Sequence, residues 1–343
     1  MGELNPEIVI YGAGAIGSTV GGWLASRGKK VYFLDRGENV KVLKEKGLQA
    51  YLLGKKELSK AIPVNAITDL AERATADIVV LAVKNYDLEA AAKDIKSKMK
   101  KEPVIVTLQN GLVNQTIVPK YFSKVIFGVI CYNAWRDAPN IFGYQHKGPI
   151  HFGVLDKNLI SDRDRIVTLF SDAFPCIAED RLVDAMKCKM LLILTNSITA
   201  LIGLGVRKIN DVKSYKNIVA NVLYEGMQIL MKAGVAEVKL ETLPTWKTLK
   251  SAMTLPAFLS TIIFKKNIKK MQMSSMAQDK FILKSKVTEI ESLNGFFVNL
   301  AESIGFDAKY NIALYKIARD EFAKDDFKPL DETDLWAKIS KSS

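Results

Sequence analysis

The first half of the chain alternates short apolar runs, rich in β-branched residues, with longer stretches in which apolar residues recur every three or four positions. This alternation predicts strands joined by helices, as in a parallel sheet covered on both faces. The expected strands are Glu7–Tyr11, Lys30–Asp35, Asp77–Val83, Pro103–Leu108 and Lys124–Ile130, and the helices between them are Ala15–Arg27, Tyr86–Met99 and Asn114–Tyr121. A glycine-flanked extended stretch, Gly148–Val154, is expected to complete the sheet. The pattern predicts an α/β domain with a mostly parallel, doubly wound sheet.

The second half has a different pattern of apolar and polar residues, because segments typical of strands become scarce after about Leu182. Long segments with helical periodicity predict helices, with Gly234 and Gly305 as C-terminal caps. These segments are Val183–Leu204, Lys216–Ala233 and Gln278–Ser303. We therefore expect two domains, an α/β domain over residues 1–180 and an all-α domain over 181–343. The strongly charged tail, Ala323–Ser343, is expected to be solvated.

Composition and charge narrow the class of protein. The chain has 343 residues, of which 48% are apolar and 25% charged, as in ordinary globular proteins. Its formal net charge of +12 suits an anionic ligand, nucleic acid or an anionic membrane surface. The cysteines Cys131, Cys176 and Cys188 show no CxxC spacing, so they predict reduced intracellular thiols rather than disulfides or a zinc site.

One stretch, Met190–Val206, carries no charge and could be a membrane span. It is short for that purpose and contains Thr195, Asn196 and Ser197, so we expect a buried helix instead. The polar start, Met1–Glu7, does not resemble a targeting signal. We expect a cytoplasmic protein with no membrane partner.

A glycine turn follows the first expected strand. Gly12-Ala13-Gly14-Ala15-Ile16-Gly17 places GxGxxG at the opening of a helix, which is the context of a dinucleotide-binding turn. Gly12 allows the tight turn, Gly14 lets the backbone approach a pyrophosphate, and Gly17 lets helix and strand pack closely. The unpaired N–H groups of the helix N-terminus suit an anion. We therefore expect a Rossmann-type domain that binds NAD or NADP.

The end of the second expected strand bears on which of the two is bound. Asp35 could accept hydrogen bonds from the ribose 2′-hydroxyl of NAD. Arg36 follows it at once and could pair with the 2′-phosphate of NADP. The residues alone leave this choice open.

Two further polar residues follow expected strands of the same sheet. Lys84 comes after Asp77–Val83, and Asn110 comes after the strand that ends at Leu108. Both should lie at carboxyl ends of strands, where open α/β sheets bind ligands. A lysine in such a place is often only solvated, and Asn110-Gly111 is also a turn signal. Their shared location favours both as site residues.

The charge-free helix also carries candidates. Lys189 and Asn196 differ by about 700° around a helix, which puts them within about 20° of the same face, whereas Lys187 and Asn196 lie on opposite faces. A lysine that shares a site with Asn196 is therefore Lys189, although both lysines could be solvent-exposed caps. Further along, Thr288-Glu289 could be no more than a helix start.

Taken together, these segments resemble the ketopantoate reductase (2-dehydropantoate 2-reductase) family from Glu7 to about Ser303. The resemblance is carried by the glycine turn, Val83-Lys84, Leu108-Gln109-Asn110-Gly111, the Lys189 helix with Asn196–Leu201, Ser274-Ser275-Met276-Ala277-Gln278-Asp279, and Thr288-Glu289-Ile290 with Asn294-Gly295. The order of these motifs matches the order in the family.

The family reduces the 2-oxo group of ketopantoate with NADPH and forms pantoate for pantothenate and coenzyme A synthesis. The resemblance implies a Rossmann domain followed by a helical substrate domain. Arg36 matches the position that meets the 2′-phosphate, so NADPH is expected rather than NADH. Lys84 and Asn110 match residues beside the nicotinamide and the substrate.

The helical half supplies the remaining expected roles, again as the resemblance implies them. Lys189 matches the catalytic lysine and Asn196 a substrate-pocket asparagine. Ser275 matches the serine that holds the substrate carboxylate, and Glu289 the acid near the substrate hydroxyl. The expected partner is a small 2-oxo acid, and a homodimer is plausible.

The sequence also departs from the family pattern. Ile193 stands where the lysine helix usually carries an asparagine, and the interval from Asp279 to Glu289 is about two residues longer than expected. A related 2-oxo acid reductase or an opine-type dehydrogenase therefore stays open as an alternative.

A third alternative is a non-catalytic, NADP(H)-binding redox sensor that meets nucleic acid through clustered lysines, which are Lys265, Lys266, Lys269 and Lys270. No nucleic-acid motif accompanies them, so we expect no such partner. The histidines, His146 and His151, lack the spacing of a metal site, and we expect no metal.

Overall fold

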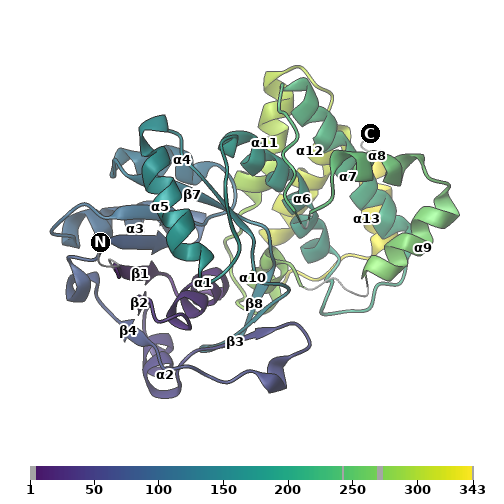
Figure 1. The fold of residues 1–343 in the computed structure, drawn as a ribbon. Helices are drawn as coiled ribbons and strands as arrows, with labels where there is room; N and C mark the ends of the chain where they lie inside the picture. Colours follow the sequence, from purple (N-terminus) through teal and green to yellow (C-terminus); the bar gives the residue numbers. More distant parts are fainter. Residues whose placement is uncertain (1–4, 242, 269–272, 342–343) are drawn as a thin grey trace. The chain divides into compact units, whose positions relative to one another are not determined.

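The computed structural model describes residues 5–241, 243–268 and 273–341 (Figure 1). The chain divides into two compact units, Met1–Leu182 and Val183–Ser343. The first unit is an α/β structure and the second is helical throughout its described residues, apart from an isolated bridge between Leu204 and Arg207.

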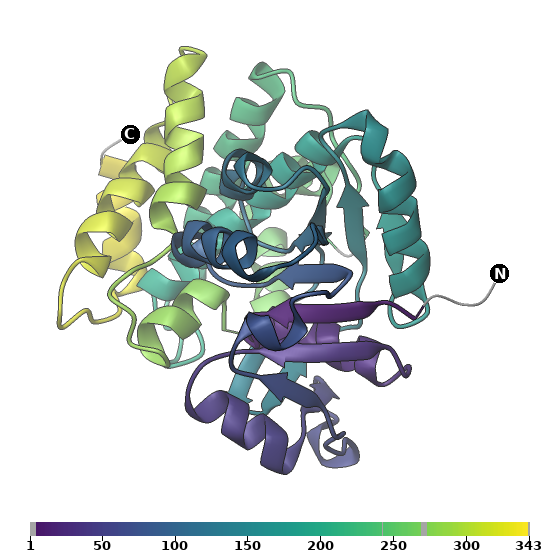
Figure 2. The same ribbon diagram turned by 90° about the vertical axis from the view of Figure 1, so that its left-hand side faces the viewer.

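The first unit is built on an eight-stranded sheet in the order β11-β10-β7-β6-β5-β1-β2-β4. Its strands are β1 (Glu7–Tyr11), β2 (Lys30–Leu34), β4 (Asn65–Ile67), β5 (Ile78–Leu81), β6 (Val104–Thr107), β7 (Val125–Ile130), β10 (Ile150–Gly153) and β11 (Cys176–Ala178). Neighbouring strands pair in parallel except β7 and β10, which are antiparallel. Figure 2 shows β1 and β2 side by side in purple. The mostly parallel sheet predicted from the sequence is confirmed.

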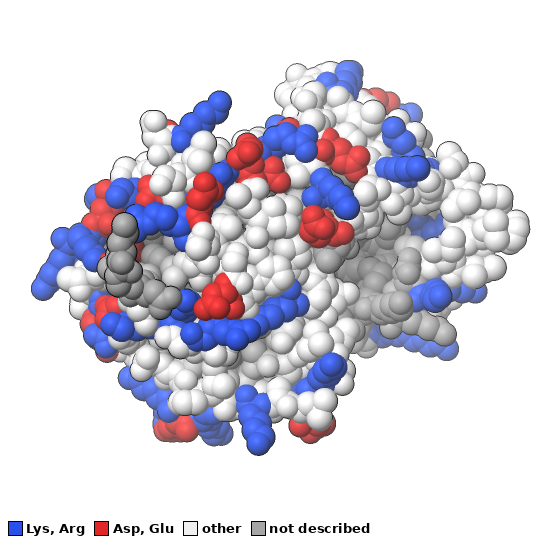
Figure 3. Space-filling model, viewed as in Figure 1, with Lys and Arg blue, Asp and Glu red and all other residues white. Residues whose placement is uncertain are grey.

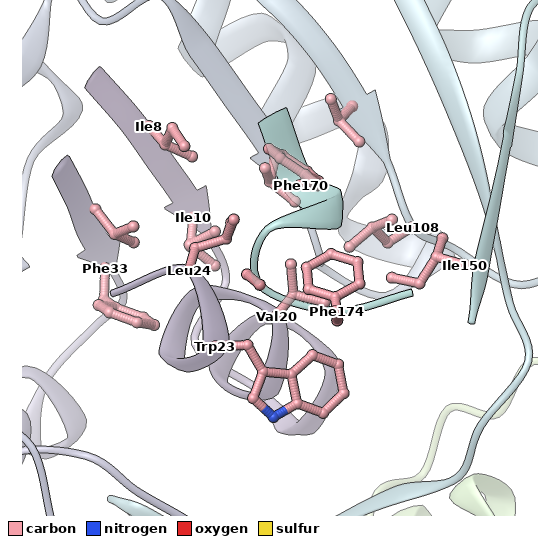
Figure 4. Close-up of a cluster of buried hydrophobic side chains, with 14 of the residues drawn as sticks. Ile8, Ile10, Val20, Trp23, Leu24, Phe33, Leu108, Ile150, Phe170 and Phe174 are labelled. Atoms are coloured by element: carbon pink, nitrogen blue, oxygen red, sulfur yellow. The ribbon is translucent and has the colours of Figure 1, made fainter. Parts of the chain in front are cut away.

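Helices cover this sheet. They are α1 (Ala15–Ala25), α2 (Glu38–Lys46), α3 (Leu88–Lys98), α4 (Val113–Ile117) and α5 (Ile160–Ser171), with 3₁₀ turns at Lys56–Leu58, Leu70–Arg73, Asn85–Asp87, Val118–Lys120 and Lys157–Leu159. One core forms where α1 and α5 pack on the sheet, around Ile10, Phe33 and Phe170 (Figure 4). The alternate strand residues Val9 and Val79 are equally buried on the opposite face. Burial on both faces explains the continuous apolar runs of these strands.

A second, three-stranded sheet was not expected from the sequence. Its order is β3 (Gln49–Leu52), β9 (Ile141–Tyr144) and β8 (Ala134–Ala138). All three strands contact α1. Trp23 of α1 packs against Tyr132 and Tyr144, with ring centroids 5.1 Å apart in both pairs. The small sheet thus covers the side of α1 that the main sheet leaves open.

The second unit surrounds a long central helix, α7 (Val212–Lys232), which contacts most of its neighbours. The other helices are α6 (Leu182–Leu201), α8 (Trp246–Thr254), α9 (Ala257–Ile268), α10 (Ser275–Phe281), α11 (Ile290–Ser303), α12 (Lys309–Phe322) and α13 (Glu332–Lys341). Gly234 and Gly305 follow α7 and α11 with positive φ angles, as expected of C-terminal caps.

The prediction of one helix over Gln278–Ser303 is wrong. Helix α10 ends at Phe281 and α11 begins at Ile290, and Lys284 between them has a φ of 48°. The ammonium of Lys280 donates to the carbonyl oxygens of Ser285 and Phe322, at 3.1 and 2.9 Å. This contact with α12 holds the connection in a non-helical path, although apolar residues continue at helical spacing.

The expectation of a solvated tail holds for Ala323–Asp326, which are exposed, but it is wrong for α13. Within Ala323–Ser343, α13 buries Leu335 and Ile339 and contacts α7. The carboxylate of Glu332 is fully buried and lies 2.9 Å from the guanidinium of Arg207. A buried ion pair of this kind resists removal of either partner. The inner face of α13 therefore belongs to the core of the second unit.

The charge-free stretch Met190–Val206 begins within α6, where Leu194 and Ile198 are fully buried. Among the described residues, no helix is both long and apolar enough to cross a membrane.

Candidate active site

The glycine turn joins β1 to α1 as expected. Gly12 has a φ of 103°, a conformation that favours glycine, and its N–H donates to the carbonyl oxygen of Leu34 at 3.0 Å. Gly14 is the N-cap residue of α1, which has no side-chain cap and no acid in its first turn. The first N–H groups of this helix therefore suit an anion.

The space around each glycine differs. A Cβ atom at Gly17 would lie 2.1 Å from the carbonyl oxygen of Gly12 and 2.9 Å from a methyl of Ile10, so no side chain fits there. A Cβ atom at Gly14 would meet nothing within 4 Å. The turn thus leaves open space at Gly14, at the N-terminus of α1, whereas Ala13 is buried.

The end of β2 carries a chain of polar contacts. The Asp35 carboxylate accepts hydrogen bonds from the Arg36 N–H at 2.7 Å and from the Asn39 amide at 3.1 Å. The amide oxygen of Asn39 accepts in turn from the Arg136 guanidinium, which comes from β8 of the small sheet. Burial lowers the pKa of Arg136, while the charge of Asp35 raises it. The side chain of Arg36 is exposed.

The loops after β5 and β6 are tied together. The Asn85 amide, next to Lys84, donates to the carbonyl oxygen of Asn110 at 2.8 Å. The Gln109 amide donates to the carbonyl oxygens of Leu81 and Val83, at 2.9 and 3.2 Å. Since β6, β5, β1 and β2 are neighbours in the sheet, Lys84, Asn110, the glycine turn and Arg36 all lie at the carboxyl ends of adjacent parallel strands. Such an edge is where open α/β sheets bind dinucleotides.

In the second unit, the structure brings two of the expected residues into contact. The Asn196 amide on α6 donates to the Ser275 hydroxyl at the start of α10, at 3.3 Å. Ser274 reinforces this contact, because its hydroxyl accepts from Thr199 at 2.7 Å and donates to the Asn196 carbonyl oxygen at 3.3 Å. The seven residues from Lys189 to Asn196 correspond to about 10 Å along the helix axis, on one face.

Glu289 lies at the start of α11. It is the N-cap residue and is buried, but its side chain forms no capping hydrogen bond. Thr288 is therefore not the helix cap. The Asn294 amide, further along α11, donates to the Ser197 hydroxyl of α6 at 3.0 Å. This bond links α11, which follows Glu289, to α6, which carries Lys189.

Sequence reasoning missed Asn39 and Arg136 and gave Gln109 no role. Arg136 lies on a strand that was not expected, so nothing in the sequence linked it to β2. Gln109 could have been found as a polar residue directly after an apolar strand. Its Oε1 atom is buried and accepts no hydrogen bond within the described part of the chain.

The remaining sequence candidates are placed as follows. His146 contacts the carbonyl oxygen of Gly148 at 2.6 Å, and His151 contacts Glu179 at 3.3 Å. No group of three His, Cys, Asp or Glu residues in the described ranges could hold a metal ion. Lys265 and Lys266 are exposed in the last turn of α9, whereas Lys269 and Lys270 lie outside the described residues.

Comparison with known protein families shows to which family this chain belongs. The family described as ketopantoate reductase PanE/ApbA matches residues 8–157, and its C-terminal part matches residues 183–321. The chain belongs to the ketopantoate reductase family. Its members include the 2-dehydropantoate 2-reductase of Pyrococcus abyssi, which is 25% identical over 92% of this chain and 98% of its own length. The protein is thus an NAD(P)H-dependent oxidoreductase of the 2-dehydropantoate 2-reductase type.

Solved structures agree with this fold. A ternary structure of D-mandelate dehydrogenase with NADH and anilino(oxo)acetate superposes with a TM-score of 0.74 at 19% identity, and covers 94% of this chain and all of its own. A dimeric ketopantoate reductase from Staphylococcus aureus gives a TM-score of 0.65 at 18% identity, and covers 92% of this chain and 98% of its own.

Proposed function

We propose that this protein reduces the 2-oxo group of ketopantoate to the hydroxyl of pantoate with NADPH, a step of pantothenate and coenzyme A synthesis. The observation that carries the proposal is the hydrogen bond between Asn196 and Ser275, which are 79 residues apart in the sequence. Both match residues that bind substrate in the family. A shared polar site on the face of α6 that also carries Lys189 is what a bound 2-oxo acid requires.

NADPH is the proposed cofactor. Gly12, Ala13, Gly14, Ala15, Ile16 and Gly17 would hold its pyrophosphate, and Lys84 and Asn110 would lie beside its nicotinamide. Arg36 would meet the 2′-phosphate, since guanidinium groups bind phosphate oxygens in pairs. Arg136 adds a second positive charge, because Asn39 links its guanidinium to Asp35. These contacts support NADPH rather than NADH.

The chemistry needs a hydride, a proton and a fixed carbonyl. When bound, the reduced nicotinamide supplies the hydride to the carbonyl carbon. Lys189 gives a proton from its ammonium to the carbonyl oxygen, which becomes the hydroxyl. Glu289 orients Lys189 and the new hydroxyl, while Asn196 and Ser275 hold the substrate carboxylate. Such positioning makes proton transfer effective.

A second candidate is the reduction of a different 2-oxo acid by the same residues. Ile193, which is buried on α6, stands where the family usually has an asparagine. An apolar residue at this position favours a substrate with an apolar group in place of the hydroxymethyl end of ketopantoate. A panel of 2-oxo acids tested with NADPH separates the two candidates.

The decisive experiment compares two lysines on one helix. Lys189→Ala should lower kcat for ketopantoate by roughly 10²- to 10⁴-fold, the usual contribution of a general acid. Lys187→Ala is the matched control, because Lys187 lies on the opposite face of α6, and it should keep nearly full turnover. A folded Lys189→Ala variant with wild-type turnover would show that another group donates the proton.

We further propose that the enzyme is a cytoplasmic homodimer. Cys131, Cys176 and Cys188 form no disulfide, which supports a reducing compartment. The dimeric relative from Staphylococcus aureus supports the oligomeric state.

A further inference from the structure

Helix α9 carries large apolar side chains on both of its faces. On the inner face, Phe264 packs against Tyr215 of α7, with ring centroids 5.1 Å apart. The buried hydroxyl of Ser260 lies on the same side and accepts from Lys216 at 3.1 Å. On the outer face, Phe258 is 66% exposed and Ile262 is 61% exposed. A helix that is apolar on both sides is typical of a helix buried on both sides.

The exposed apolar surface of α9 includes more residues than Phe258 and Ile262 and extends beyond the helix. Leu259 and Ile263 are 41% and 53% exposed, and Met253 and Leu255 extend the surface toward α8. In Figure 3 the surface over α9 is mostly white. Scattered single apolar residues are normal on a protein surface, but a patch of several such neighbours marks a binding surface.

The size of the patch fits a second copy of the chain. With roughly 200 Å² for a large, fully exposed side chain, the patch presents on the order of 500 Å² on each copy. Two copies would bury about 1,000 Å², the lower limit of a specific interface. Within α9, the exposed pairs Phe258 and Ile262, and Leu259 and Ile263, are four residues apart, the spacing of the ridges by which one helix fits the grooves of another.

The patch has an uncharged centre and charged residues at its edge, as is usual in an interface between two proteins. Phe258, Leu259, Ile262 and Ile263 carry no charge, while Lys265 and Lys266 follow in the last turn, at the rim of the patch. An interfacial membrane helix needs a polar face opposite to its apolar face. The opposite face of α9 packs on α7 instead.

We infer that the outer face of α9 pairs with the same face of a second copy of this chain around a twofold axis. This assignment rests on the proposed homodimer and is independent of the proposed reaction. An isologous contact of this kind closes on itself and gives a dimer rather than a filament.

The test is the mass of the full chain in sedimentation equilibrium. Ile262→Lys should raise the dimer dissociation constant on the order of 100-fold, because the substitution occurs twice in a central apolar contact. Ile282→Lys is the matched control, since Ile282 is 58% exposed but lies outside α9, and its dissociation constant should equal that of the wild type. Phe258→Lys serves as a second variant if the first does not fold.

Three outcomes would overturn the inference. The wild type could be monomeric at high micromolar concentration, or the Ile262 and Ile282 variants could dissociate alike. A monomeric wild type that cosediments with phosphatidylserine-containing vesicles would make a lipid surface the occupant instead. The mass is measured without cofactor or substrate. A monomeric mass therefore contradicts the proposed interface, whereas the lack of reductase activity contradicts the proposed reaction, and the two results can be told apart.

Discussion

At the scale of single residues, the contacts of Asp35 bear on cofactor choice. Both of its carboxylate oxygens already accept hydrogen bonds, from the Arg36 N–H and from Asn39. A carboxylate has about four lone-pair positions, so Asp35 can still accept a hydrogen bond from a ribose 2′-hydroxyl. In the proposed complex a 2′-phosphate would meet Arg36, and the hydrogen bond from Arg136 to Asn39 brings a second positive charge toward Asp35. The preference therefore depends on the guanidinium groups, and the proposed preference is for NADPH.

Arg136→Ala should therefore weaken NADPH binding on the order of 10-fold or more, since a hydrogen bond to a charged group contributes roughly 1.5–3 kcal/mol. NADH binding should change little, and Arg136→Lys should recover part of the affinity. Cofactor titrations followed by isothermal calorimetry measure both constants. An equal loss for NADPH and NADH would mean that Arg136 only braces β8 against α2.

At the scale of elements, the sequence predicted what repeats locally and missed what depends on distant partners. The strands of the main sheet are apolar runs bounded by turns, so β1, β5 and β7 were predictable. β3 has four residues and pairs with β9, which lies about ninety positions later in the sequence. A local pattern of apolar residues cannot predict a pairing over this distance. The break after Phe281 depends on Lys280 reaching Phe322 of α12, a contact that periodicity cannot reveal.

The candidate site divides in the same way. Family motifs marked Asn196 and Ser275, and these residues are in contact. Arg136 was missed because its strand was missed, and Asn39 because its role depends on Arg136. Residues that act through a single motif can be read from the sequence, whereas residues that act through a long-range contact cannot.

The cap of α7 gives a prediction at the same scale. The Asp211 carboxylate accepts from the N–H groups of Lys213 and Ser214 and from the Thr333 hydroxyl near α13. Asp211→Ala should cost about 1 kcal/mol at neutral pH, the usual value for an N-cap. Urea unfolding measures this difference, with the exposed Asp334→Ala as the control.

The same variant should show a defined pH dependence. The hydrogen bond with the side chain of Ser214 is the largest cause that lowers the pKa of Asp211 below its usual 3.8. A lowered folded-state pKa means that the stabilisation is complete above pH 3.8 and is lost as the pH falls through the folded-state pKa. Wild type and Asp211→Ala should therefore converge in acid. A gap that persists after protonation would assign the cost to packing.

At the scale of the whole molecule, the protein has a net charge of +12, and the substrate and the cofactor of the proposed reaction are both anions. A positive field raises the encounter rate of such ligands and is screened by salt. Under the proposed reaction, the positive charge would increase the rate at which these anionic ligands are captured.

We expect kcat/KM for the oxo acid to fall several-fold as the Debye length shrinks from about 30 Å at 0.01 M salt to about 8 Å at 0.15 M, with kcat nearly constant. Steady-state rates over a sodium chloride series measure this, with sucrose at equal osmolality as the control. A flat kcat/KM would mean that the surface charge has no part in substrate capture.

The small sheet of β3, β9 and β8 has an evolutionary consequence. It carries Arg136, whereas the glycine turn and Arg36 belong to the main sheet. If Arg136 supports the 2′-phosphate as proposed, substitutions confined to this small sheet would alter coenzyme preference without changing the glycine turn.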